Sequence, residues 1–366
     1  MKKILFAAVN LDVGGIETAL VTLLNYLAEE KENNNYKYDI TLVLEEKKGI
    51  FLDALNKKIN IIEYTPNKNK IIFIRKIINF IKQLKFKLKY KNKFDFACSY
   101  ATYSLPACFV AREASKNATL WCHMDYLAQF NENKDMVKDF FSNRQFKKFK
   151  RLVFVSEKSK QTFLEVYPEM KDKAYFINNL IDYEAIKEKS LENIKEEIDK
   201  KNNVIFINIG RHDEEQKRLT RLIEACKILK ENKLKFKVLL VGDGKDTQMY
   251  KDMVSDYKLE NIVLFLGRKS NPYPYLNISD CMILTSEYEG SPVVFTETMI
   301  LNKPIITTGV AGSEQILNKY GFIAQKDAKD IAEKMQNFIE QGYKIKKSFE
   351  PEKYNADIIK KLTTII

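Results

Sequence analysis

Histidine, tryptophan and paired cysteines are scarce in this chain of 366 residues, which has two histidines, one tryptophan and five cysteines. The cysteines form no CxxC pair and have no histidine at a metal-ligand spacing. Because disulfide frameworks and zinc sites need such pairs, the sequence predicts neither, and reduced buried thiols are expected instead. The cysteines are Cys98, Cys108, Cys122, Cys226 and Cys281.

Long apolar runs are also lacking, since none approaches the ~20 residues of a membrane-spanning helix. The apolar start at residues 4–9 ends at Asn10 and is too short for the core of a signal peptide. We interpret it as a buried first strand and expect a cytoplasmic protein. A composition of 45% hydrophobic and 30% charged residues indicates a globular chain, and its length suits two domains.

The positive charge is unevenly distributed along the chain. Of the net charge of +12, residues 1–182 carry a surplus of ten (31 Lys and Arg against 21 Asp and Glu), and residues 183–366 carry two (30 against 28). This asymmetry predicts that the first half alone meets an anionic surface, either phospholipid or nucleic acid.

Short apolar runs alternate with helix-like stretches, which is typical of βα units on parallel sheets. We predict two Rossmann-like α/β domains, 1–182 and 204–345, joined by a charged linker at 183–203 and followed by a helical tail at 346–366 that is expected to cross back to the first domain. A cleft facing the carboxyl ends of both sheets would suit a phosphorylated or nucleotide ligand. The predicted strands are residues 4–9, 39–44, 60–63, 94–99, 119–122, 151–155, 174–177, 204–208, 237–241, 262–265, 281–284, 304–308 and 321–324.

The segment from Thr285 to Glu297 follows a predicted strand and opens a helix near Pro292, because proline favours the first helical position. The first amides of that helix would suit a diphosphate. Glu289 and Glu297 could hold two sugar rings on either side of it, namely the donor sugar and the ribose. Alternatively, Ser291 only caps the helix and both glutamates are solvated.

A second loop, from Gly210 to Leu219, places Arg211 and Lys217 six residues apart between a strand and a helix. The guanidinium fork of arginine and the point charge of lysine could clamp both phosphates of a nucleotide. The alternative is an ordinary basic loop.

Several motifs occur in the order and spacing of the retaining GT-B glycosyltransferases of family 4, and the resemblance covers nearly the whole chain. It implies a GT-B fold, with two Rossmann-like domains facing across a cleft. The motifs are Gly14-Gly15-Ile16-Glu17, Val155-Ser156-Glu157, Asn178-Asn179-Leu180-Ile181-Asp182, Gly210-Arg211…Lys217, Gly242-Asp243-Gly244, Phe265-Leu266-Gly267 and Glu289-x7-Glu297.

The resemblance also implies roles for single residues. Arg211 and Lys217 would neutralise the diphosphate as it leaves. Glu297 would bind the ribose, Glu289 the donor sugar, and His123 would contact the transferred sugar, although lone histidines are more often structural. The other implied donor-binding residues are Gly15, which would approach the diphosphate, the phosphate cradle of Ser291, Pro292, Val293 and Val294, and Gly242 and Arg268 near the base.

One feature departs from the family pattern, because Ser291-Pro292 stands where an aromatic residue and a glycine often follow the Glu289-Gly290 pair. Assignment of the donor sugar by analogy is therefore unsafe. No metal or other cofactor is expected, since Arg211, Lys217 and the helix terminus would do the electrostatic work of a Mg²⁺ ion.

Residues 66–94 contain ten Lys and Arg and no acid, and their apolar residues keep a helical spacing. The helix either faces the core with its apolar stripe or lies on an anionic membrane, where the lysines would contact lipid. The apolar stripe is Ile74, Ile77, Ile78, Ile81, Leu84 and Leu88, and the basic residues of the expected membrane and acceptor face are Arg75, Lys76, Lys82, Lys85 and Lys89.

The resemblance and the charge together predict retaining transfer from a nucleotide sugar, with UDP as the expected nucleotide. The acceptor would be a glycan or a lipid-linked glycan, as in bacterial capsule or other surface polysaccharide synthesis, at the inner face of the membrane. Two rivals are a sugar-nucleotide epimerase of the same architecture and a basic nucleic-acid-binding protein. The second is disfavoured because no recognisable RNA- or DNA-reading module accompanies the basic residues.

Overall fold

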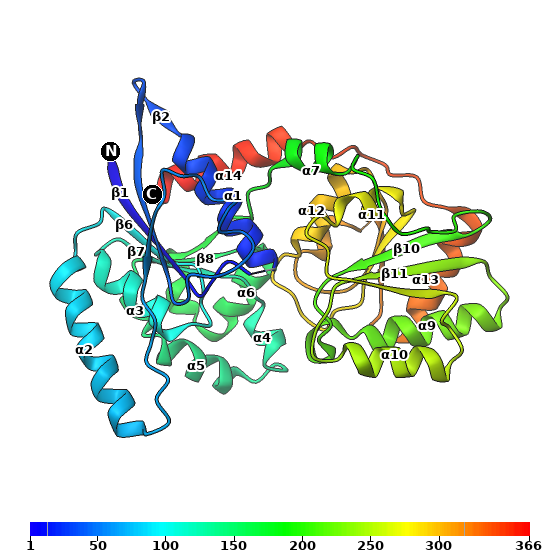
Figure 1. Cartoon of the computed structure of the whole chain (residues 1–366), viewed down its shortest axis with the longest axis horizontal. Coiled ribbons are helices and arrows are strands. Elements are labelled where there is room, and N and C mark those ends of the chain that lie inside the picture. The colour runs from blue at the N-terminus through cyan, green and yellow to red at the C-terminus, as the bar shows by residue number, and fades with distance from the viewer. Residues whose placement is uncertain (13, 318) are drawn as a thin grey trace. The chain divides into compact units, whose positions relative to one another are not determined.

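The computed structural model describes residues 1–12, 14–317 and 319–366, which form two compact units (Figure 1). The first unit is Met1–Leu180 together with Ala356–Ile366, and the second is Ile181–Asn355. The last helix, α14 (Pro351–Ile365), begins in the second unit and continues in the first. No helix among the described residues has the length and apolar character needed to cross a membrane.

The first unit contains a parallel sheet of seven strands in the order β5-β4-β1-β6-β7-β8-β9. Its central strands are buried throughout, which explains why they read as continuous apolar runs. The strands are β1 (Lys2–Ala8), β4 (Tyr38–Leu44), β5 (Asn60–Glu63), β6 (Phe96–Ser99), β7 (Ala118–Cys122), β8 (Arg151–Phe154) and β9 (Ala174–Phe176).

Side chains specify where several helices of this unit begin. The Ser104 hydroxyl accepts from the Ala107 amide at the start of α3, and Asn133 caps α5 in the same way. A short hairpin of β2 (Lys31–Glu32) and β3 (Asn35–Tyr36), absent from the predicted strands, turns through two left-handed asparagines. The helices are α1 (Gly15–Glu29), α2 (Ile72–Tyr90), α3 (Leu105–Ala114), α4 (Tyr126–Gln129), α5 (Lys134–Asn143) and α6 (Glu157–Val166).

The second unit contains a parallel sheet of six strands in the order β12-β11-β10-β13-β14-β15. Successive residues of one strand enter different apolar clusters: Phe206 belongs to one, and Ile205 and Ile207 to the other. Both faces are therefore covered. The strands are β10 (Val204–Ile209), β11 (Phe236–Val241), β12 (Val263–Gly267), β13 (Cys281–Leu284), β14 (Ile305–Thr308) and β15 (Gly321–Ala324).

The helices of this unit include part of the segment expected as a linker. Residues 183–203 belong to the second unit, and their first helix, α7, packs against α11 and α12. The charged composition reflected an exposed helix face, because Ile186 is buried on the other side. The helices are α7 (Tyr183–Lys189), α8 (Glu214–Lys217), α9 (Leu219–Glu231), α10 (Thr247–Asp256), α11 (Tyr273–Ile278), α12 (Val293–Ile300) and α13 (Ala328–Gln341).

Each sheet reverses its strand order beside its first strand. In the first unit the reversal lies between β1 and β6, and in the second it lies between β10 and β13. Loops that leave the carboxyl ends of strands at such a switch point diverge and leave room for a ligand. The fold therefore directs attention to the loops after β10 and β13, which carry Arg211, Lys217 and Glu289.

Candidate functional site

A buried ion pair joins the loops after β10 and β13. The Lys217 ammonium lies 2.6 Å from Glu289 Oε1, and the side chains are only 16% and 8% exposed. Ser286 Oγ donates to the same oxygen at 2.7 Å, and Gln216 Nε2 donates to Glu289 Oε2 at 3.3 Å. The interpretation of Glu289 as a solvated loop residue is therefore wrong, because burial of its carboxylate is offset by three donors.

The backbone holds these two loops together as well. The Glu287 amide donates to the Gln216 carbonyl at 2.7 Å, and the Thr285 hydroxyl donates to the Lys217 carbonyl at 3.0 Å. The pair is thus positioned from the end of α8 on one side and the strand end of β13 on the other. Such a preorganised charge needs no rearrangement when an anion arrives.

Arg211 lies at the solvent side of this network. Its guanidinium donates to Gln216 Oε1 at 3.2 Å and lies 3.9 Å from Asp213 Oδ2, while the side chain is 64% exposed. It is therefore more exposed to solvent than Lys217, and Gln216 links it to Glu289. A chain of donors and acceptors thus runs from the surface to the buried pair.

The helix after Glu289 begins one residue later than predicted. Pro292 is the N-cap residue of α12, with a non-helical backbone and no capping bond from a side chain in the described part of the chain, and Val293 is the first helical residue. The interpretation of Ser291 as the cap is therefore wrong. Val293 and Val294 occupy the first turn, where amides have no partners within a helix and favour an anion.

Glu297 lies in the same helix and is 8% exposed. The Tyr273 hydroxyl of α11 donates to its Oε1 at 3.0 Å. Burial raises the pKa of Glu297 to about 7, although the bond from Tyr273 partly opposes the shift. The side chain is therefore not solvated, and it takes up and releases its proton near neutral pH.

The glycines after β10 and β11 serve close backbone packing. A Cβ on Gly242 would lie 1.8 Å from the Gly210 carbonyl oxygen, and Gly242 also has a φ of +150°. A Cβ on Gly244 would lie 2.1 Å from the carbonyl oxygen of buried His212. These contacts explain why residue 242 is a glycine, independently of any ligand.

Arg268 follows β12 and is exposed. Its charge acts on Asp243, whose carboxyl accepts from the Thr247 hydroxyl at 2.7 Å and the Gly244 amide at 2.8 Å. The hydroxyl bond first, then the amide bond, and more weakly Arg268, hold the pKa of Asp243 below its usual range. Gly242 and Arg268 thus belong to loops on the β12 side of the switch point.

The expected residues of the first unit lie at the ends of its own strands. His123 follows β7, is 7% exposed and packs with its ring 4.4 Å from that of Tyr100. Burial lowers the pKa of His123 to about 3, so the imidazole is neutral. Its Nε2 has no hydrogen-bond partner within the described part of the chain. Gly15, which follows β1, is the first residue of α1.

The five basic residues of α2 that were expected at the membrane face divide into two groups. Arg75, Lys76, Lys85 and Lys89 are exposed. Lys82 instead donates to the Thr65 carbonyl at 2.7 Å and is partly buried, so its expected contact with a membrane is not supported by its position.

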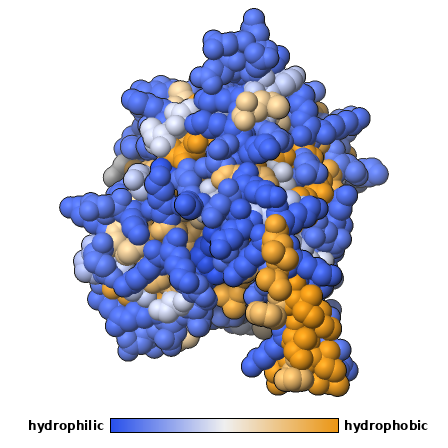
Figure 2. Space-filling view, turned by 90° about the vertical axis from the view of Figure 1, so that its left-hand side faces the viewer, coloured by the Kyte–Doolittle hydropathy of each residue, from blue (hydrophilic) through white to orange (hydrophobic). Residues whose placement is uncertain are grey.

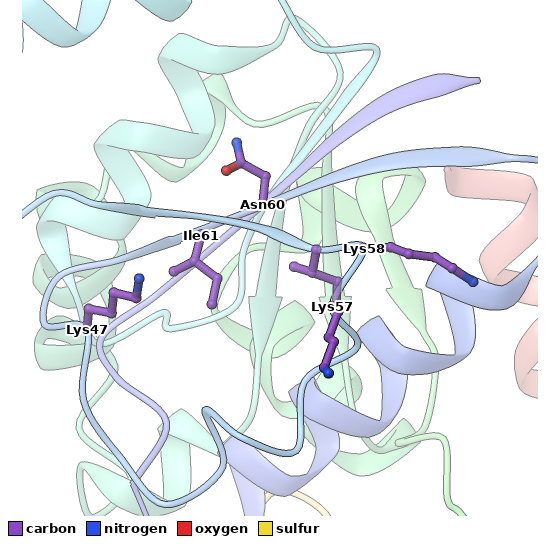
Figure 3. A pocket seen from close by; sticks show the side chains of 6 residues that line it. Lys47, Lys57, Lys58, Asn60 and Ile61 are labelled. Carbon is purple, nitrogen blue, oxygen red and sulfur yellow. The ribbon is translucent and has the colours of Figure 1, made fainter.

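An open pocket of about 490 Å³ lies beside the edge strand β5, and its lining includes none of the predicted site residues (Figure 3). Lys47, Lys57 and Lys58 line it, and Lys58 is paired with Glu29 at 2.8 Å. Lys57 and Lys58 come shortly before β5, and lysines at the edge of a sheet oppose pairing with another chain. In the ranges that the structure describes, no three His, Cys, Asp or Glu side chains are grouped so that they could hold a metal ion.

Three supporting residues were not predicted from the sequence. Ser286 and Gln216 contact Glu289, and Tyr273 contacts Glu297. Gln216 precedes Lys217 and Ser286 lies close before Glu289, so their positions in the sequence could have identified them as candidates. Tyr273 is 24 positions from Glu297, and only the packing of α11 beside the switch point brings them together.

Comparison with known proteins supports this architecture. Residues 189–356 match the family described as Glycosyl transferases group 1. An uncharacterized glycosyltransferase of Methanocaldococcus jannaschii is 25% identical over 66% of this chain and 63% of its own length. The N-acetyl-alpha-D-glucosaminyl L-malate synthase of Bacillus anthracis is 32% identical over 38% of this chain. The chain thus spans less than two thirds of the first of these relatives and 37% of the second.

A relative from Campylobacter jejuni aligns over 89% of this chain and 87% of its own length at 23% identity. Its name is N-acetylgalactosamine-N,N'-diacetylbacillosaminyl-diphospho-undecaprenol 4-alpha-N-acetylgalactosaminyltransferase. Among solved structures, Anabaena HepE in complex with UDP and glucose matches with a TM-score of 0.74 at 17% identity, covering 100% of both chains. Residues 189–356 thus match the group 1 glycosyltransferase family, and the chain has the two-domain GT-B fold.

Proposed function

We propose that this chain is a retaining glycosyltransferase that moves a sugar from a UDP-sugar to a glycan or lipid-linked acceptor in bacterial surface polysaccharide synthesis. The observation that carries the proposal is the buried pair of Lys217 and Glu289 at a switch point, beside the first turn of α12. The complex of HepE with UDP and glucose supports the choice of donor. The name of the Campylobacter relative includes a sugar on diphospho-undecaprenol, and this supports the choice of a lipid-linked acceptor.

In the proposed chemistry, positively charged groups lie where negative charge develops on the diphosphate. As the bond between the anomeric carbon and the diphosphate breaks, Lys217, Arg211 and the amides of Val293 and Val294 would take up the growing negative charge. The acceptor oxygen would bond to the anomeric carbon on the same face, and its proton would leave with the diphosphate. Glu289 would hold the hydroxyls of the donor sugar.

The remaining contacts would orient the donor. Glu297 would accept from the vicinal hydroxyls of the ribose, and Ser291 and Pro292 would shape the phosphate cradle. From the first domain, neutral His123 would contact the transferred sugar and Gly15 would approach the diphosphate. Gly242 would fix the loop beside the base, next to Arg268.

The proposal is tested by incubating the protein with a panel of nucleotide sugars and a polyprenyl-diphosphate-linked glycan. Transfer from one UDP-sugar, with the anomeric configuration retained in the product by NMR, is the expected result. Consumption of the donor without any acceptor would favour the epimerase rival. Absence of both transfer and thermal stabilisation by every nucleotide sugar would contradict the proposal.

Transfer should survive dialysis against EDTA, because Lys217, Arg211 and the start of α12 supply the positive charge that a metal ion would otherwise provide. The measurement is turnover before dialysis, after it, and after Mn²⁺ or Mg²⁺ is added back. The undialysed protein kept for the same time is the control. Turnover that disappears with EDTA and returns with either ion would show that a metal takes part.

We also propose that the protein is cytoplasmic and peripheral, at the inner face of the membrane. The surplus of ten positive charges in residues 1–182 supports an anionic partner for that half. The expected alternative, in which the apolar stripe of α2 faces the core, is wrong, because Ile77, Leu84 and Leu88 are exposed. A gel-shift assay addresses the nucleic-acid rival, which requires duplex or single-strand binding with a steep salt dependence.

A further inference from the structure

Helix α2 presents one continuous apolar face to solvent. Figure 2 shows it as a hydrophobic strip on the projecting part of the first unit. Contiguous apolar patches on a soluble surface mark interaction sites, whereas single exposed apolar residues need no explanation. The face consists of Phe73, Ile74, Ile77, Phe80, Ile81, Leu84 and Leu88, each between 38% and 76% exposed.

The opposite side of the helix fastens it to the domain. Phe86 is 5% exposed and its ring lies 5.4 Å from that of Tyr64 and 6.0 Å from that of Phe109. The Asn79 side chain accepts from the Asn67 amide at 2.7 Å, and Lys82 donates to the Thr65 carbonyl. The exposed apolar face is therefore held in place by aromatic packing and hydrogen bonds on the inner side.

Lysines lie along both borders of the apolar face. At 100° per residue, Lys76 and Lys87 fall on one border, and Lys85 and Lys89 on the other. Residues 66–94 contain no acid that could neutralise them, although Lys87 lies 3.6 Å from Glu113 of α3. An apolar centre with cationic borders matches the cross-section of a bilayer surface, where acyl chains lie below the phosphates.

We propose that α2 is an in-plane anchor that inserts this apolar face into the surface of an anionic bilayer. A second copy of the chain fits less well, because two such faces would bring four borders of like charge together. A nucleic acid would meet Phe, Ile and Leu side chains first rather than the lysines. Insertion thus adds an apolar contribution to the charge attraction proposed above.

The anchor is connected to the carboxyl edge of the first sheet. The segment between β5 and α2 carries Thr65, whose hydroxyl donates to the Glu45 carbonyl at 2.6 Å. The Ser104 hydroxyl at the start of α3 donates to the Glu45 carboxyl. The switch point between β1 and β6 lies at this edge. Membrane binding would therefore hold the edge close to the bilayer. This last step rests on the proposed transfer to a lipid-linked acceptor.

Insertion is tested with tryptophan as a probe, because the native Trp121 is 1% exposed. Leu84→Trp places the probe on the apolar face, and Gln83→Trp places it on an adjacent exposed position outside that face. With vesicles of equal parts phosphatidylcholine and phosphatidylglycerol, Leu84→Trp should shift to shorter wavelength and be quenched by brominated acyl chains. Gln83→Trp should do neither. Equal responses of both probes would overturn insertion.

Co-sedimentation with the same vesicles separates the two contributions. Phe80→Ser with Leu84→Ser should lower partitioning tenfold or more. Changing Lys76, Lys85 and Lys89 to Gln should lower it about fivefold for each charge removed. The matched control is Leu191→Ser with Met249→Ser, two exposed apolar residues of the second unit, which should bind as the native chain does.

UDP affinity by calorimetry distinguishes a failed anchor from a failed transferase, since none of these variants touches the second unit's site. A native chain that stays in the supernatant with anionic vesicles at low salt overturns the anchor whatever the transfer assay shows. A native dimer that becomes monomeric in the Phe80 and Leu84 variant, without vesicle binding by the native chain, assigns the face to a second copy instead.

Discussion

Lys217→Ala should lower both UDP affinity and turnover by about 30- to 1,000-fold, which corresponds to about 2–4 kcal/mol. The reason is geometric, because Lys217 is only 16% exposed and its ammonium lies 2.6 Å from the Glu289 carboxylate. Removal of the lysine leaves that carboxylate buried without its cation and facing the incoming diphosphate. Titration calorimetry with UDP and initial rates of transfer are the two measurements.

A second variant separates the loss of a diphosphate contact from a loss of folding. Lys217→Ala combined with Glu289→Gln removes the unpaired charge, so its melting temperature should return toward the native value while UDP affinity stays low. Lys329→Ala, at an exposed position of α13, is the matched control and should change neither quantity. Native UDP affinity in Lys217→Ala would remove the lysine from the donor site.

Arg211→Ala should cost less than Lys217→Ala. The arginine side chain is 64% exposed, and it is linked to the buried pair through Gln216. Solvent screens an exposed charge, so its interaction with the diphosphate is weaker than that of a buried one. We expect a loss of about tenfold in UDP affinity. A larger loss than that of Lys217→Ala would reverse the order of the two residues.

The strands were the most predictable part of the fold. Each of the thirteen predicted apolar runs coincides with a strand of the two sheets, within a few residues at its ends. Strands buried on both faces must be apolar throughout, so residues such as Phe206 and Ile207 carry the signal without knowledge of their neighbours. The loop residues Lys217 and Glu289 could be located because they follow such strands.

Orientation was not predictable where both sides of a helix are apolar. The spacing of Ile77, Leu84 and Leu88 correctly predicted a helix, but Phe86 on the opposite side is the residue that packs against the domain. Periodicity identifies a stripe, whereas contact with a specific neighbour decides which stripe is buried. The same limit applies to Lys82, whose bond to Thr65 depends on the path of the chain before the helix.

Glu297→Gln should stabilise the protein at pH 8 and weaken UDP binding there. The carboxyl has a pKa of about 7 in the folded chain, raised from 4.5 by burial, so the folded state binds its proton more tightly than the unfolded state does. The stabilisation that comes from this tighter proton binding is therefore fully present below pH 4.5 and is lost as the pH rises through about 7. A shift of that size corresponds to about 3 kcal/mol.

Urea denaturation at a series of pH values tests the stability part. The difference between Glu297→Gln and the native chain should grow between pH 5 and pH 8 and approach about 3 kcal/mol, because glutamine cannot ionise. Tyr273→Phe removes the bond that favours the carboxylate, so it should move the midpoint to higher pH. Tyr275→Phe, in the same helix but bonded to Glu196, is the matched control and should leave the midpoint unchanged.

UDP binding should show the opposite dependence on pH. The proposed ribose contact needs an ionised acceptor, so affinity of the native chain should rise through about pH 7, and Glu297→Gln should lose that rise. Titration of the UDP phosphate is common to both proteins, so their difference reports Glu297 alone. If the Glu297 carboxylate lowers the stability of the fold at the pH at which it binds UDP, glutamate at this position serves function rather than stability. A variant that gains stability at pH 8 yet binds UDP as the native chain does would contradict the ribose assignment.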